Sequence, residues 1–142
     1  MSPVAALLWP MLAHMGLTLG LYVWLTLARS AAVKRGEVDY SAFVLGREEP
    51  REVTRITRNL ANQFELPVFF YTLAVLLILF GRVTTIDIAA AWVFVAGRLI
   101  HTLVQTLTED VRLRGRVFMI NTLAVVVLAA HVGMLAFEGI GR

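Results

Sequence analysis

Apolar residues gather in four long segments that together make up most of the chain. The segments are residues 4–28, 60–81, 88–108 and 117–137. Each is close to the length of about 20 residues that an α-helix needs to cross the hydrocarbon of a bilayer. Helices are the only structures of this length that satisfy their own backbone polar groups in lipid. The pattern therefore predicts an all-α fold, an integral membrane four-helix bundle formed by one domain, residues 1–142.

Composition agrees with this prediction. Hydrophobic residues make up 58% of the chain, charged residues only 16%, and the mean hydropathy is +0.75. This balance suits a bilayer better than water. The first segment has no basic residues before it and no small-residue cleavage site after it, so we expect a retained helix and not a signal peptide.

The basic residues predict the orientation in the membrane. Ten of them lie in two connections, residues 29–58 and 109–116, whereas Arg82 and Arg142 lie on the other side. Basic residues near membrane spans favour the cytoplasmic side. We therefore expect both connections in the cytoplasm and both termini outside. A short chain of this kind suits a bacterial inner membrane.

Several classes of function find no support in the sequence. The net charge of +3 and the pI near 10 do not indicate nucleic acid, because the basic residues are divided between two connections that flank membrane spans. The chain has no cysteine, which excludes disulfides, thiolate metal sites and cysteine nucleophiles. Its three histidines are too scattered to suggest a metal site, and we expect no metal.

Polar residues interrupt two of the apolar segments at helical spacing. The two sets are Arg58, Asn62 and Glu65, and Arg98, His101 and Gln105. Spacings of i, i+4, i+7 and i, i+3, i+7 place each set on one face of its helix. Charged residues inside membrane segments usually serve a function. We therefore expect the two faces to lie opposite one another and to enclose a small polar ligand.

Two prolines are expected to shape the second helix. Pro50 stands among the acidic residues of the stretch 48–52, a pattern typical of a helix start, so the helix is expected to begin before it enters the membrane. Pro67 removes a backbone donor and crowds the preceding turn, which predicts a kink.

The run from Arg58 to Phe69 resembles the Arg-x-x-x-Asn-x-x-Glu signature, followed by proline and aromatic residues, of the membrane-associated proteins in eicosanoid and glutathione metabolism (MAPEG). Arg98 and His101 are similar to that family's third-helix pattern of Arg followed three residues later by His or Tyr. The resemblance implies a homotrimer of four-helix bundles. It also implies that glutathione, as the co-substrate, lies between neighbouring subunits near the cytoplasmic side.

The resemblance also assigns roles to individual residues. It implies cofactor binding by Arg58, Asn62, Glu65, Arg98, His101 and Gln105. Arginines suit the two carboxylates of glutathione, and a glutamate suits its ammonium group. Arg112 and Arg114 are the candidate catalytic residues, because a nearby cation stabilises a thiolate. Gln105 departs from the family pattern, since many enzymatic relatives have a tyrosine there.

Three functions remain open at this stage. One is a glutathione-dependent transferase or peroxidase that acts on a small lipophilic electrophile from the membrane lipid. Another is a lipid-binding protein of the same architecture without catalysis, and the last is a small multidrug exporter. Structural roles remain open too: Glu65 and Arg98 as an ion pair, Arg58 as an interfacial anchor, Asn62 and Gln105 as hydrogen-bonding links between helices, and His14 and His131 as packing or interface residues.

Overall fold

Helices make up nearly all of the computed structural model, which describes residues 1–44 and 49–140. They are α1 (Pro3–Lys34), the short 3₁₀ helix η1 (Tyr40–Phe43), α2 (Arg51–Asn62), α3 (Leu66–Leu79), α4 (Thr85–Leu107) and α5 (Val111–Ile140). The described residues contain no strand. Within the described residues, four spans are long and apolar enough to cross a membrane: α1, the consecutive helices α2 and α3 taken as one span, α4, and α5. The predicted all-α membrane fold of four helices is confirmed.

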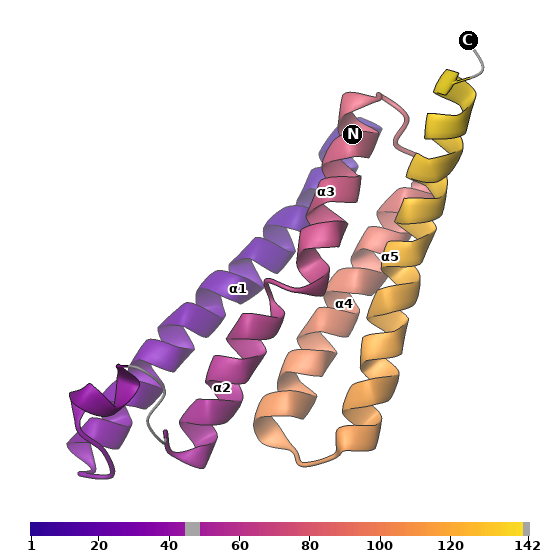
Figure 1. The fold of residues 1–142 in the computed structure, drawn as a ribbon. Coiled ribbons are helices and arrows are strands. Elements are labelled where there is room, and N and C mark those ends of the chain that lie inside the picture. Colours follow the sequence, from indigo (N-terminus) through magenta and orange to yellow (C-terminus); the bar gives the residue numbers. More distant parts are fainter. Residues whose placement is uncertain (45–48, 141–142) are drawn as a thin grey trace.

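The two ends of the bundle differ in what they carry. Both termini lie at one end, and the connection from α1 to α2 and the turn from α4 to α5 lie at the other (Figure 1). This arrangement agrees with the charge pattern, which places the two basic connections on the same side of the membrane. Glu48, part of the expected helix start, lies outside the described residues, but α2 does begin directly after Pro50.

The second membrane span is broken and not merely kinked. α2 ends at Asn62, and α3 begins at Leu66 with Pro67 in its first turn. Pro67 has no N–H to offer the carbonyl of Gln63, and its ring would collide with that carbonyl in a continuous helix. The expected uninterrupted segment 60–81 is therefore two helices with a change of direction between them (Figure 1).

Two helices extend beyond their expected apolar segments. α1 continues past residue 28 and ends where Gly36 adopts a φ of 71°, and α5 begins at Val111, ahead of residue 117. Asp110 explains the early start of α5, because its Oδ1 accepts a hydrogen bond from the backbone of Leu113 at 2.8 Å. Hydropathy marks the part of a helix that lies in lipid, whereas helical hydrogen bonding continues into the polar surroundings.

The break decides which helices contact each other. α2 packs on α1 and α4, while α3, beyond the break, packs on α5. Two apolar cores result. One lies between α1 and α2, and the other joins α1, α3, α4 and α5 around the stacked rings of Phe70 and Phe94, whose centroids are 4.3 Å apart. α2 and α5 face each other across a groove beside the end of α4.

α4 and α5 approach each other closely beside this groove. A Cβ atom on Gly97 would lie only 1.9 Å from the Oδ1 atom of Asn121, and Asn121 itself is fully buried. Only glycine permits this approach without a shift of the neighbouring side chain. The close contact fixes the position of α5 relative to the polar face of α4.

Candidate functional site

Two adjoining cavities occupy the groove between α2 and α5. The inner cavity, beside the helix break, has a volume of about 510 Å³. The outer cavity, beside the turn from α4 to α5, has a volume of about 420 Å³. Both are lined by Arg58, Gln105, Val111 and Arg114. The cavities are therefore two parts of one groove, and each falls within the size range of small-molecule sites.

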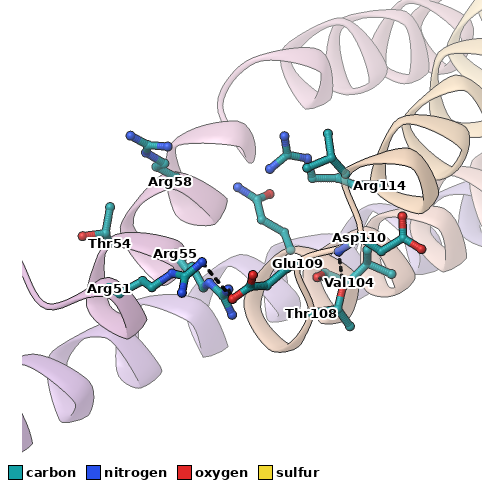
Figure 2. A pocket seen from close by; sticks show the side chains of 11 residues that line it. Arg51, Thr54, Arg55, Arg58, Val104, Thr108, Glu109, Asp110 and Arg114 are labelled. Atoms are coloured by element: carbon teal, nitrogen blue, oxygen red, sulfur yellow. Dashed lines mark hydrogen bonds and ion pairs between the residues drawn. The ribbon is translucent and has the colours of Figure 1, made fainter.

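The inner cavity brings together most of the residues that the sequence singles out. Its lining includes Arg58, Asn62, Glu65, His101, Gln105 and Arg114. Arg58 and Asn62 belong to α2, and Glu65 lies in the break that follows it. His101 and Gln105 belong to α4, and Arg114 belongs to α5. Figure 2 shows Arg58 and Arg114 on opposite walls of the groove. Arg98 and Arg112 line neither of the two cavities.

Three charged groups of the inner cavity remain available to a ligand. Among the residues that the structure describes, Arg58, Glu65 and Arg114 form no ion pair. Arg58 and Glu65 are exposed, and Arg114 is half-buried. The cavity thus offers two guanidinium groups and one carboxylate whose charges are not already compensated by an ion pair within the described part of the chain.

Arg98 lies behind this cavity and not in its wall. Its side chain is fully buried. Its Nη2 donates a hydrogen bond to the backbone carbonyl of Asn62 at 3.0 Å, and its Nε donates to Oε1 of Gln63 at 3.2 Å. The Asn62 carbonyl belongs to the last turn of α2, where helical partners are missing. A cation at this helix end also opposes the helix dipole favourably.

The proposed structural ion pair between Glu65 and Arg98 is not found among the described residues. The helix break explains the difference. A regular helix would keep Glu65 on the same face as Asn62, but Glu65 lies in the break and is exposed on the groove side. Arg98 instead donates to the backbone carbonyl of Asn62 and to the side-chain oxygen of Gln63.

Gln105 holds two asparagines of α2 in place. Its Oε1 accepts hydrogen bonds from Nδ2 of Asn59 and from Nδ2 of Asn62, both at 3.0 Å. Asn59 in turn accepts a hydrogen bond from Thr102 at 3.0 Å. Gln105 therefore connects α4 with α2 and fixes the amide of Asn62 at the cavity wall.

His101 has an unused polar atom beside the inner cavity. The residue is 3% exposed, and its Nδ1 has no hydrogen-bond partner within residues 1–44 and 49–140. Its ring lies against Phe118 at a centroid distance of 6.3 Å. A buried polar atom without a hydrogen-bond partner is costly.

Sequence reasoning missed the network that supports the site from behind. His14 is fully buried, with Nδ1 2.7 Å from the hydroxyl of Tyr71 and Nε2 3.1 Å from Oε1 of Gln63. Gln63 also contacts Arg98 and Asn59. The sequence interpretation of His14 as a packing or interface residue considers only partners on its own helix, where Thr18 bonds to its backbone carbonyl and not to its ring. Its partners come from α3 and from the break, which helical spacing along α1 does not reveal.

The comparisons with known proteins add one result. A family model described as "MAPEG family" matches residues 7–134, which is most of the chain and includes every residue of the inner cavity. Comparison with curated proteins and with solved structures finds no match.

Proposed function

The chain belongs to the MAPEG family, and we propose on this basis that it is a membrane-embedded, glutathione-dependent transferase or peroxidase that acts on lipophilic electrophiles. One observation carries the proposal: the inner cavity holds two arginines and one glutamate without ion-pair partners in the described part of the chain. Glutathione presents carboxylates, an ammonium group and a thiol, and these charges are complementary to such a set.

The positions of the side chains suggest how the ligand is held. The γ-glutamyl end of glutathione carries an ammonium group and a carboxylate side by side, and Glu65 and Arg58 supply the opposite charges. Asn62 and His101 add uncharged hydrogen bonds. Arg98 contributes by holding the carbonyl of Asn62, so in this proposal it positions the site and does not touch the ligand.

Arg114 is the residue that we assign to the thiol. It reaches the groove from α5, opposite the residues of α2, and lines both cavities. An ordinary thiol with a pKa of about 8.5 becomes a useful nucleophile near neutral pH when a cation stabilises its thiolate. The thiolate sulfur then attacks an electrophilic carbon, or one oxygen of a hydroperoxide, and the leaving group departs with the electron pair of the broken bond.

The membrane supplies the second substrate in this proposal. Phe118 lines the inner cavity and is 40% exposed, and large apolar residues cover the outside of the bundle. A lipophilic electrophile dissolved in the bilayer can therefore reach the groove from the side. We further propose that three chains assemble as a homotrimer in which a neighbouring subunit covers the open groove. We also propose that the basic connections lie in the cytoplasm of a bacterial cell.

A glutathione titration of the purified chain in detergent tests the proposal. We expect saturable growth of thiolate absorbance in the ultraviolet, a rise in the temperature of unfolding, and conjugation of a model electrophile such as an aromatic halide. Binding without thiolate or conjugation would instead support the lipid-binding interpretation. The absence of any thiol binding would contradict the proposal.

A further inference from the structure

The outer cavity contains a carboxylate that belongs to the protein itself, the side chain of Glu109. Oε1 of Glu109 lies 2.8 Å from Nη2 of Arg51 and 2.9 Å from Nη2 of Arg55. Glu109 belongs to the turn between α4 and α5, whereas both arginines belong to α2, so the carboxylate spans the mouth of the groove (Figure 2). The outer cavity thus already shows where a carboxylate binds between two guanidinium groups.

This contact is easily given up. The side chains of Glu109 and Arg51 are 64% and 74% exposed, and that of Arg55 is 24% exposed. Exposed ion pairs contribute little to stability, because water solvates both partners well when they separate. A ligand carboxylate that is held in the groove by other contacts can therefore replace Glu109 at little cost.

The spacing of the polar residues on α2 places this anion site in line with the inner cavity. The residues that share the face are Arg51, Arg55, Arg58 and Asn62. The helix rises about 10 Å from Arg55 to Asn62, and three extended peptide residues reach about 10 Å. A tripeptide whose one end lies by Asn62 and Glu65 can therefore bring its other end to Arg55.

We infer that Glu109 occupies the subsite for the second carboxylate of the thiol tripeptide and acts as its internal competitor. The inference rests on the proposed function, which places the γ-glutamyl end of glutathione at Arg58 and Glu65. The glycine carboxylate then displaces Glu109 from Arg51 and Arg55. Glu109 thereby sets how strongly the groove selects thiols with an anionic group at both ends.

Binding of two ligands by two variants tests this inference. The ligands are glutathione and its glycine monoethyl ester, which lacks only the second carboxylate. Glu109→Gln should lower the dissociation constant for glutathione about three- to tenfold and leave that for the ester nearly unchanged. Arg55→Gln should weaken binding of glutathione more than binding of the ester. Calorimetric titration of the full chain in detergent gives all of these values.

A matched control separates local competition from a general change in charge. Glu52 is also exposed in the first turn of α2, but it does not line the outer cavity, and Glu52→Gln should affect both ligands little and equally. Equal gains of both ligands in Glu109→Gln, or no gain, would overturn the inference while leaving the proposed function intact. Failure of the unaltered chain to bind either ligand would overturn both, and unfolding temperatures without ligand would show that each variant is folded.

Discussion

Arg98 donates a hydrogen bond from Nη2 to the backbone carbonyl of Asn62 at 3.0 Å, across the point where the second membrane span breaks. This carbonyl belongs to the last turn of α2, which does not continue into α3. A buried cation thus supplies a hydrogen bond to a backbone carbonyl at the end of α2, within the second membrane span. The same contact holds Asn62 at the wall of the inner cavity, so the integrity of the fold and the shape of the site depend on one side chain.

Replacement of Arg98 should destabilise the protein. Arg98→Met keeps much of the volume but leaves the Asn62 carbonyl and the Gln63 amide oxygen without this donor. We expect a loss of about 1–3 kcal/mol in the free energy of unfolding, measured by thermal or chemical unfolding in detergent. Arg112→Met is the control, because Arg112 is exposed and lines neither cavity. Equal stability of the two variants would contradict the role assigned to Arg98.

Glu65 should behave in the opposite way. It is exposed and has no ion-pair partner among the described residues, so Glu65→Gln should change the free energy of unfolding by less than about 0.5 kcal/mol. The same change removes the partner proposed for the ammonium group of glutathione. Calorimetry should therefore show weaker binding of glutathione at an unchanged free energy of unfolding. A marked loss of stability would instead support a structural role of Glu65, such as the ion pair with Arg98.

Arg114 and Arg112 can be separated by the pKa of a bound thiol. If Arg114 stabilises the thiolate, Arg114→Met should raise the pKa of bound glutathione by about one unit or more, which is about 1.4 kcal/mol per unit. The thiolate form would then persist only at higher pH, and conjugation near neutral pH would slow. Arg112→Met should leave both the pH profile of thiolate absorbance and the conjugation rate close to those of the unaltered chain. A larger effect at Arg112 would reverse the assignment.

The orientation in the membrane can be tested by cysteine labelling, since the chain has no cysteine of its own. Ser41 belongs to η1, in the connection from α1 to α2, and Gly115 follows the turn from α4 to α5, so Ser41→Cys and Gly115→Cys probe the two basic connections. In intact cells both should resist a membrane-impermeant maleimide and react after permeabilisation. Ser2→Cys, at the other end of the bundle, should react in intact cells. The reverse pattern would contradict the proposed topology.

The sequence by itself determined that the protein lies in a bilayer and not in water, how many times it crosses the membrane, and one face of the site. These properties are local. Runs of apolar residues fix where a helix crosses lipid, and the spacing of Arg58 and Asn62 is readable from α2 alone, whereas Glu65 lies beyond the end of that helix. Pro67 indicated a disturbance in the second span, but the sequence did not show whether the helix would bend or break.

Tertiary structure decided which polar residues face the groove and which support it. Arg98 and His101 belong to one helix, yet Arg98 donates to the backbone carbonyl of Asn62 at the end of α2, while His101 lines the cavity. Helical spacing places residues relative to their own axis, whereas the choice between cavity and support depends on which neighbouring helix offers an unpaired group. His14 gains its partners in the same way, and Arg114 is distinguished from Arg112 only by the packing of α5 against α4.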